Sequence, residues 1–304
     1  MNNLNLHETL SGSEIALGCM RIADMTDAQV ADLLAAALEN GINFFDHADI
    51  YGGGESESVF ARAVAKLGCV RDSLVIQTKC GIRKGFYDFS KEHILTSVEN
   101  SLRRLNTDYV DALVLHRPDV LMHPEEVAEA FHELKVSGKV RFFGVSNFRP
   151  TQIELLQSAV PDRLIINQMQ FGVAHTGMID SGINVNTLNA EAVDRDGSVL
   201  EYCQLKKITV QTWSPFQYGA FQGVYWSSPH YEELTSVIEA LAKEKGVSAA
   251  AVAIAWILRH PAKMQVIVGT TNSKRLADMS TASGLLLSRE EWYKIYLASG
   301  KPLP

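Results

Sequence analysis

The sequence lacks long hydrophobic runs and contains few cysteines, and both scarcities narrow the possible classes of protein. The longest apolar run, residues 249–258, is far too short to span a bilayer. The four cysteines are scattered and form no C-x-x-C pair, so nothing indicates a zinc knuckle or a thioredoxin-type motif, and free thiols are expected. Residues 1–16 have neither a basic start nor an apolar core, so no signal peptide is predicted. We therefore expect a cytoplasmic protein.

Basic charge is also scarce. The chain carries 28 Lys and Arg against 35 Asp and Glu, which gives a formal net charge of -7. A nucleic-acid partner requires a basic face, so this balance argues against one, although a small anionic ligand could bind in a locally basic pocket. The 304 residues, 46% hydrophobic and 21% charged, have an ordinary globular composition. This length allows two domains, but an α/β barrel of this size is routinely one.

Nucleotide-binding fingerprints are absent. No G-x-G-x-x-G follows a predicted strand, and no G-x-x-x-x-G-K-[ST] is present. The three glycines at 52–54 lack the required register and run into Glu55 and Glu57, which would repel a phosphate. A doubly wound dinucleotide-binding sheet is therefore disfavoured.

The chain instead alternates short apolar strands with helical segments. After a small hairpin in residues 4–17, strands are predicted at 15–17, 42–45, 74–78, 110–115, 140–145, 164–167, 208–212 and 265–268. Their continuous apolar character is typical of a parallel sheet covered on both sides. Eight strand–helix units predict an α/β fold, a (β/α)8 barrel with an N-terminal β-hairpin, as a single domain over residues 1–304.

Ionisable residues stand where three of these strands end. The second strand runs into Asp46, with Tyr51 shortly after it, and the next two strands end at Lys79 and His116. Strand ends open on one face of a barrel, so we expect these four side chains around one pocket. A nearby ammonium group should lower the tyrosine pKa, a carboxylate should keep the lysine charged, and the histidine could orient a substrate oxygen. The set predicts a proton donor aimed at a developing alkoxide.

These residues resemble the catalytic tetrad of the aldo-keto reductases. The resemblance rests on D-x-A-x-x-Y at 46–51, Lys79 and His116, and it covers nearly the whole chain through GVSNF at 144–148, NQ at 167–168, WSP at 213–215 and GTTNSKR at 269–275. It implies a (β/α)8 barrel that binds an extended nicotinamide cofactor and reduces aldehydes or ketones to alcohols. In this reading Tyr51 is the proton donor, Lys79 and Asp46 tune it, and His116 orients the carbonyl.

The resemblance also implies the cofactor contacts. The carboxamide would be held by Ser146, Asn147 and Gln168, and the nicotinamide would stack on Trp213. The pyrophosphate would be wrapped by Ser214, Pro215, Phe216 and Gly219. The adenosine end would meet Gly269, Thr270, Thr271, Asn272, Arg275 and Asp278. Apart from the resemblance, Met20 and Arg21 directly follow the first predicted strand and could border the nicotinamide. Gly269 stands where many members carry a lysine for the 2′-phosphate, but Arg275 remains, so NADPH is favoured over NADH.

Two other functions stay open on the sequence. A metal-dependent barrel hydrolase could use Asp46, His47, Asp49 and His116 as a two-metal cluster, although the later strand ends carry Asn, Gln, Trp and Gly, and our prediction is no metal. A non-catalytic NADP-binding sensor or subunit could use the same scaffold. For partners we expect a small-molecule carbonyl substrate, no nucleic acid and no membrane, and a monomer or weak homo-oligomer. The identity of the substrate is not determined by the sequence, because variable loops set it.

Overall fold

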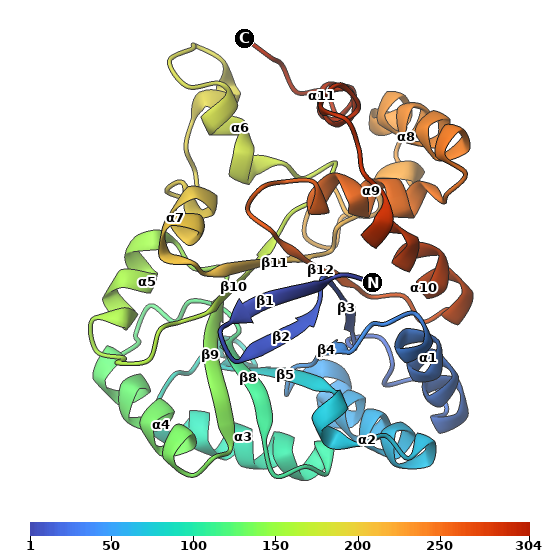
Figure 1. Ribbon diagram of the computed structural model, residues 1–304. Coiled ribbons are helices and arrows are strands. Elements are labelled where there is room, and N and C mark those ends of the chain that lie inside the picture. Colours follow the sequence, from blue (N-terminus) through green and yellow to red (C-terminus); the bar gives the residue numbers. More distant parts are fainter.

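The computed structural model describes residues 1–304 as a closed parallel barrel of eight strands surrounded by helices (Figure 1). Each strand pairs in parallel with the next, and the last closes onto the first. Around the barrel the strands are β3 (Ile15–Gly18), β4 (Phe44–Asp46), β5 (Val75–Cys80), β8 (Val110–Leu115), β9 (Val140–Ser146), β10 (Ile166–Gln170), β11 (Thr209–Trp213) and β12 (Gln265–Val268). The predicted (β/α)8 fold is confirmed.

An N-terminal hairpin closes one end of the barrel. It consists of β1 (Asn3–His7) and β2 (Leu10–Ser13), paired antiparallel, and it crosses the barrel in Figure 1. Leu6 and Leu10 are buried in a cluster with residues from inside the barrel, among them Phe44 and Val75. The hairpin approaches so closely that a Cβ on Gly12 would lie 2.9 Å from the Phe44 ring. Since this end is plugged, a ligand must enter from the opposite end, where the strands finish.

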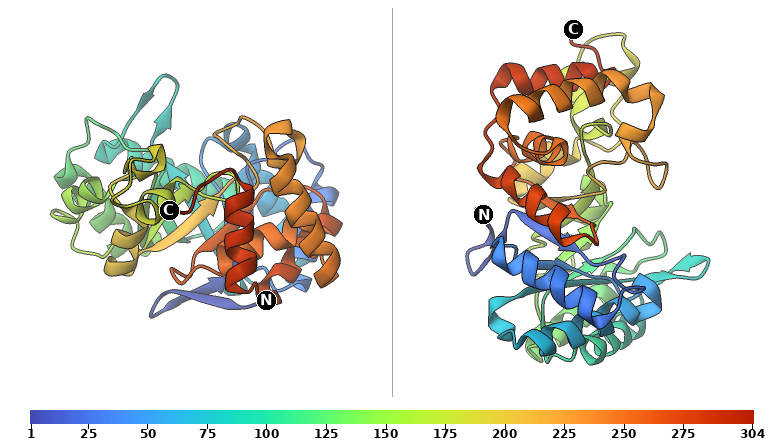
Figure 2. Two further views of the ribbon diagram at one scale, coloured as in Figure 1. Left: turned by 90° about the horizontal axis from the view of Figure 1, so that it is seen from above. Right: turned by 90° about the vertical axis from the view of Figure 1, so that its right-hand side faces the viewer.

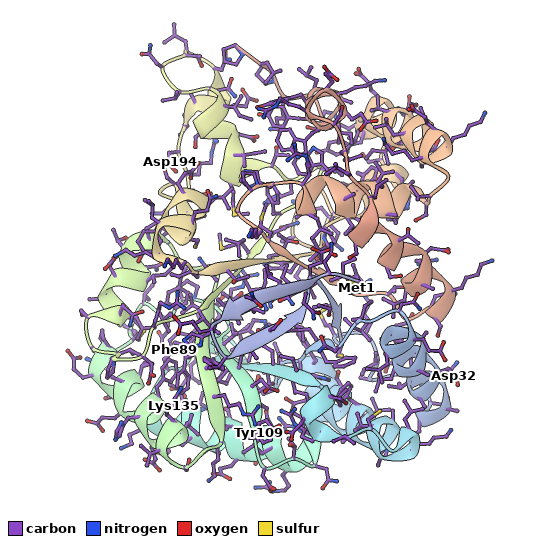
Figure 3. All side chains as sticks on the ribbon, viewed as in Figure 1. Met1, Asp32, Phe89, Tyr109, Lys135 and Asp194 are labelled. Carbon is purple, nitrogen blue, oxygen red and sulfur yellow. The ribbon has the colours of Figure 1, made fainter.

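Helices form the outer layer, and side chains fill the space between them and the strands (Figures 2 and 3). The helix α1 begins with a capping box between Thr26 and Gln29, and α2 ends at Gly68 in a left-handed conformation. The main helices are α1 (Asp27–Glu39), α2 (Glu55–Leu67), α3 (Lys91–Leu105), α4 (Pro124–Val136), α5 (Pro150–Gln157), α7 (Val199–Lys206), α8 (Glu232–Lys245), α9 (Ala249–Leu258), α10 (Ser273–Ser280) and α11 (Arg289–Ala298). Their apolar faces join the outer faces of the strands in one core of 70 buried residues.

The structure differs from the sequence prediction in detail. Two strands, β8 and β12, have the predicted bounds, whereas β4 and β10 begin two residues later and extend further along the chain. A small hairpin, β6 (Ile82–Arg83) and β7 (Phe86–Tyr87), and the short helix α6 (Gly177–Ile183) were not predicted. Elements of two to seven residues are too short to show a hydrophobic period. The β6–β7 hairpin projects from the body of the molecule in the left view of Figure 2.

None of the helices combines the length and the apolar character that crossing a membrane requires.

Candidate active site

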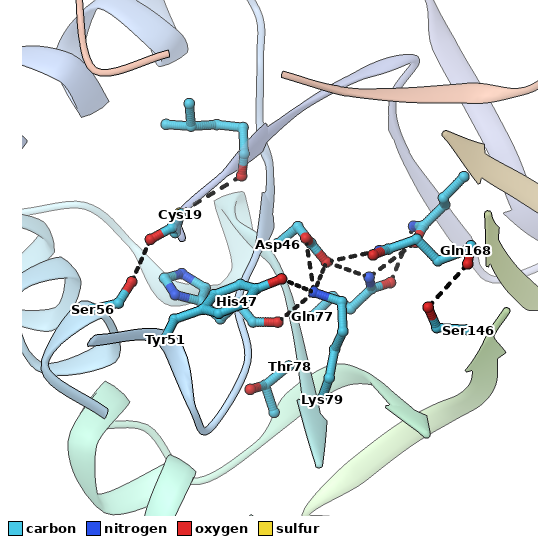
Figure 4. Close-up of polar contacts among 12 residues, drawn as sticks. Cys19, Asp46, His47, Tyr51, Ser56, Gln77, Thr78, Lys79, Ser146 and Gln168 are labelled. Carbon is cyan, nitrogen blue, oxygen red and sulfur yellow. Dashed lines mark hydrogen bonds and ion pairs between the residues drawn. The ribbon is translucent and has the colours of Figure 1, made fainter. Parts of the chain in front are cut away.

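A buried lysine lies at the centre of the candidate site. Lys79 is in β5, and its Nζ donates hydrogen bonds to the Asp46 carboxylate (2.8 Å), the His47 carbonyl oxygen (2.7 Å) and the Tyr51 hydroxyl (3.2 Å), as Figure 4 shows. Asp46 ends β4, the neighbouring strand. An ammonium group has three donors, so every N–H of Lys79 has a partner within the chain. The lysine is therefore held charged and in one position.

Tyr51 is presented by a tight turn. It opens the 3₁₀ helix η1 (Tyr51–Gly54), in which Gly52, Gly53 and Gly54 all have positive φ angles, of 57°, 64° and 97°. Glycine adopts this conformation without a steric penalty. A Cβ on Gly52 would lie 2.2 Å from the Ala23 side chain, so the turn is also closely packed. The three glycines thus serve the turn that carries Tyr51 back over Lys79.

His116 faces Tyr51 from the end of β8. Their ring centroids are 5.9 Å apart and the rings are nearly perpendicular. The Nδ1 atom of His116 is buried and has no hydrogen-bond partner in the chain. Burial, and then the positive charges of Lys79 and Arg117, lower the pKa of His116 well below its ordinary value. The imidazole is therefore neutral at physiological pH.

The pKa of Tyr51 differs from the sequence prediction. Burial raises it above the ordinary value of 10.0, and the nearby Lys79 opposes this rise without reversing it. The predicted net lowering is therefore wrong for the chain alone, because loss of hydration outweighs the attraction of the ammonium group. Burial lowers the pKa of Lys79, but the Asp46 carboxylate and Tyr51 together raise it by more than burial lowers it. The net pKa of Lys79 therefore lies above 10.5. The expectation that Asp46 keeps the lysine charged agrees with this geometry.

A network of glutamines inside the barrel supports Asp46. Its Oδ1 accepts hydrogen bonds from Gln77 Nε2 (2.6 Å) and Gln168 Nε2 (3.0 Å). The amide of Gln211 links these two glutamines and continues to Gln265 at 2.8 Å. Sequence reasoning missed this network except for Gln168. The signal was present, since Gln77 and Gln211 lie within predicted strands, Gln265 begins one and Gln168 directly follows one.

Three residues predicted to contact the carboxamide lie together with Trp213. The Ser146 hydroxyl donates to the Gln168 carbonyl oxygen (2.9 Å), and Asn147 Nδ2 donates to the Ser146 hydroxyl (2.7 Å). The Trp213 indole N–H donates to Asn147 Oδ1 (3.3 Å). The side-chain N–H groups of Gln168 are already bonded to Asp46 and Gln211. The ends of β9, β10 and β11 thus form one side of the candidate site.

The remaining predicted cofactor residues lie at the ends of β3, β11 and β12. Ser214 has a φ of 50° and opens the loop that contains Pro215, Phe216 and Gly219. Arg21, which follows Met20 after β3, donates to the carbonyl oxygen of Gly269 after β12 (3.4 Å). The segment after β12 continues through Thr270 and Thr271 to Asn272, whose side chain caps α10 by accepting the N–H of Arg275 (2.8 Å). Arg275 and Asp278 are exposed on α10.

The four residues considered for a metal cluster do not converge as ligands. No group of three or more His, Cys, Asp or Glu side chains in residues 1–304 is arranged to hold a metal ion. Asp46 is paired with Lys79. The His47 ring packs edge-on against Phe60 at 4.5 Å, and burial lowers its pKa to about 3. The geometry therefore does not support the metal-dependent hydrolase.

A second buried charge cluster lies behind the Tyr51 turn. Glu57 of α2 is fully buried and accepts hydrogen bonds from the Thr78 hydroxyl (2.6 Å) and Arg104 Nε (2.8 Å). Arg104 also lies against the turn, because a Cβ on Gly54 would be 2.8 Å from its side chain. Asp49 lies near this cluster, and burial followed by repulsion from Glu57 raises its pKa to about 6. Sequence reasoning assigned Glu57 no such role.

With this geometry described, comparison with known proteins identifies the class. Residues 14–297 match the model of the aldo/keto reductase family, and the chain belongs to that family. The chain is 38% identical to a 6-dehydroglucose reductase of Agrobacterium fabrum, over 99% of each chain. It is 31% identical to a 6-dehydroglucose reductase of Novosphingobium aromaticivorans, over 98% of this chain and 95% of that one.

A solved structure has the same fold. An aldo-keto reductase from Klebsiella pneumoniae in complex with NADPH superposes with a TM-score of 0.80 at 24% identity, over all of this chain and 96% of that one. Family membership confirms the predicted enzyme class, an NAD(P)H-dependent oxidoreductase that acts on carbonyl compounds. The roles of individual residues stay predictions.

Proposed function

We propose that this protein reduces aldehydes or ketones to alcohols with NADPH, and that Tyr51 delivers the proton. The observation that carries the proposal is the Tyr51 hydroxyl, which is hydrogen-bonded to a lysine whose other donors are occupied by Asp46 and the His47 carbonyl. When bound, the nicotinamide cofactor supplies a hydride to the carbonyl carbon. The protein contributes position, charge and a proton.

Each member of the tetrad has a separate task in this proposal. Burial keeps the Tyr51 hydroxyl protonated at neutral pH, which a proton donor requires. Lys79 stabilises the negative oxygen that Tyr51 bears after it has given up the proton. Asp46 holds Lys79 in place. The neutral His116 ring retains one N–H that can donate a hydrogen bond to the substrate oxygen and orient it.

Polar groups at the strand ends fit a nicotinamide cofactor. The hydroxyl of Thr212 and the side-chain oxygen of Gln217, on either side of Trp213, are buried without a partner in the chain. Such groups are costly unless a ligand or water satisfies them. Ser146, Asn147 and Gln168 would hold the carboxamide, Trp213 the ring face, and residues 214–219 the pyrophosphate. Arg275 is exposed and makes no ion pair, so its guanidinium is free for a 2′-phosphate, which favours NADPH over NADH.

The natural substrate is proposed from the relatives. Because two of them are named 6-dehydroglucose reductase, hydroxylated sugar aldehydes belong first in a substrate panel for this chain. We also propose a monomer in the cytoplasm. The four free cysteines, three of them buried, suit a reducing compartment.

The test of this function is Tyr51→Phe, assayed by NADPH oxidation with simple aldehydes. Loss of a general acid should lower kcat by about 10²- to 10⁴-fold while the Kd for NADPH changes little. Tyr293→Phe on α11 is the matched control, because that tyrosine makes no hydrogen bond through its hydroxyl in the structure. Full activity of Tyr51→Phe would refute the assignment. Tight NADPH binding by a wild-type protein without turnover of any aldehyde would favour the sensor instead.

A further inference from the structure

An arginine without a partner stands beside the proposed catalytic residues. Arg117 directly follows His116 at the end of β8, and its guanidinium carbon lies 5.5 Å from the centroid of the Trp213 ring. The residue is half-buried. Within residues 1–304 its side chain makes neither a hydrogen bond nor an ion pair, and none of its nitrogens is closed off from solvent. All five N–H donors are therefore open to a ligand.

The surrounding charges leave Arg117 uncompensated. The other cation of the site, Lys79, is neutralised by Asp46 at 2.8 Å, and His116 is uncharged. The carboxylate nearest in sequence, Asp119, instead accepts the backbone N–H groups of Phe89 (3.0 Å) and Leu121 (2.9 Å). The mouth of the site thus carries a net positive charge, although the chain as a whole has a net charge of -7.

The contact with Trp213 is not enough by itself to explain why Arg117 lies at this position without a partner. A cation over an aromatic ring contributes only about 0.5–1 kcal/mol at an exposed site. A half-buried guanidinium loses part of its hydration, so an acceptor within reach stabilises it even where its nitrogens still contact solvent. The other half-buried arginines all have acceptors within the chain. Arg71 and Arg104 pair with Asp111 and Glu57 at 2.7 Å, and Arg259 donates to the Leu287 carbonyl oxygen at 3.0 Å. Arg117 alone among these half-buried arginines has no acceptor in the chain, and it lies where a substrate would enter.

We propose that Arg117 binds an anionic group of the substrate, foremost a carboxylate, while the carbonyl of the same molecule lies at Tyr51 and His116. The planar guanidinium presents two parallel donors that match a carboxylate. The substrate class is then aldehydes or ketones that also carry an acid group. This inference rests on the proposed carbonyl reduction, and it places acid-bearing carbonyl compounds ahead of the neutral sugar aldehydes that the names of the relatives suggest.

The test compares an acid with its neutral ester. Wild-type protein is assayed with succinic semialdehyde and with methyl 4-oxobutanoate, which have the same aldehyde and differ in charge. We expect kcat/KM to favour the acid, and Arg117→Met to lower kcat/KM for the acid by about 10- to 100-fold while that for the ester changes less than about threefold. Methionine retains an apolar stem against Trp213 and removes the charge. The acid preference should also weaken in 0.5 M NaCl, since salt screens exposed charges.

Two further variants and a binding measurement make the result decisive. Arg117→Lys should retain part of the preference, and Arg103→Met, which removes an exposed arginine of α3, should leave it unchanged. Equal losses for acid and ester in Arg117→Met would overturn the proposal and indicate a packing role. So would a wild-type preference for the ester. Calorimetric titration of the NADPH complex with succinate compares wild type and Arg117→Met without turnover, and it therefore tests Arg117 independently of catalysis. A protein that reduced neither the acid nor the ester would contradict the proposed function and leave the role of Arg117 to be decided by this titration.

Discussion

The Lys79 ammonium lies 3.2 Å from the Tyr51 hydroxyl, yet the pKa of Tyr51 stays above its ordinary value because the hydroxyl is buried. The two effects suit successive moments of a proton transfer. In the proposed reaction, burial would keep the proton on the oxygen while the substrate binds, and the adjacent charge would stabilise the oxygen when the proton leaves. Tyr51 is thus protonated at neutral pH, and the neighbouring Lys79 would reduce the free energy needed to ionise it during the reaction.

This relationship predicts the pH dependence of reduction. His116, whose pKa burial lowers well below its ordinary value, stays neutral around neutral pH, while Tyr51, whose pKa burial raises above its ordinary value, stays protonated there. We expect kcat/KM for a neutral aldehyde to be flat between about pH 6 and 9 and to fall only at alkaline pH, as Tyr51 loses its proton. Stopped-flow measurement of NADPH oxidation checks this. A change in kcat/KM near pH 6.5 would show that His116 titrates there, and it would contradict the assignment of His116 as a neutral hydrogen-bond donor.

A second pH effect should appear in stability and originate at Asp49. Its pKa is 3.8 ordinarily and about 6 in the folded chain, so the folded state binds a proton more tightly than the unfolded state in that interval. Stability due to this group is present below pH 3.8 and is lost as the pH rises through 6. Asp49→Asn should therefore raise the free energy of unfolding by about 1–3 kcal/mol at pH 8 and have little effect near pH 4. Urea denaturation at both pH values measures the difference.

The matched control is Asp32→Asn, which changes an exposed aspartate on the outer side of α1 (Figure 3). This substitution should alter stability little at either pH. A gain from Asp49→Asn of the same size at pH 8 and pH 4 would mean that the effect does not come from ionisation.

The buried pair of Arg104 and Glu57 should be important for stability. Arg104→Met leaves the fully buried Glu57 carboxylate without its counter-ion and should cost about 3–5 kcal/mol in the free energy of unfolding. The double variant Arg104→Met with Glu57→Gln should lose less than the single variant, because the unpaired charge is gone. Denaturant titrations give both values. Arg62→Met is the control, since its partners Asp27 and Glu55 are about half exposed and such pairs contribute about 0–1 kcal/mol.

The barrel and the convergence of Asp46, Tyr51, Lys79 and His116 were predictable because they depend on position along the strands. Asp46, Lys79 and His116 each end or follow an apolar segment, and the closed parallel topology brings such ends to one face. Local pattern and topology together therefore determine where these residues lie.

Other features depend on how deeply a side chain is buried and on how neighbouring strands are aligned, and a local sequence pattern shows neither. The glutamine network requires that Gln77, Gln211 and Gln265 all point into the barrel at neighbouring levels. The direction of the Tyr51 pKa shift depends on how completely the hydroxyl is buried, and residue types alone predicted the opposite sign. The unpaired state of Arg117 is visible only once Asp119 is seen to bond elsewhere.

The last prediction concerns the choice between NADPH and NADH. Arg275→Met should raise the Kd for NADP⁺ by about 10- to 100-fold and leave the Kd for NAD⁺ nearly unchanged, because only NADP⁺ carries the 2′-phosphate that the guanidinium would bind. Lys274→Met is the matched control, since it removes an equal charge from the preceding residue of α10. Conversely, Gly269→Lys should tighten NADP⁺ selectively. A Cβ at Gly269 meets no atom within 4 Å, so the lysine can be accommodated without displacing a neighbour. Calorimetry with both nucleotides measures these constants without turnover, and equal losses for NADP⁺ and NAD⁺ in Arg275→Met would exclude a phosphate contact at that residue.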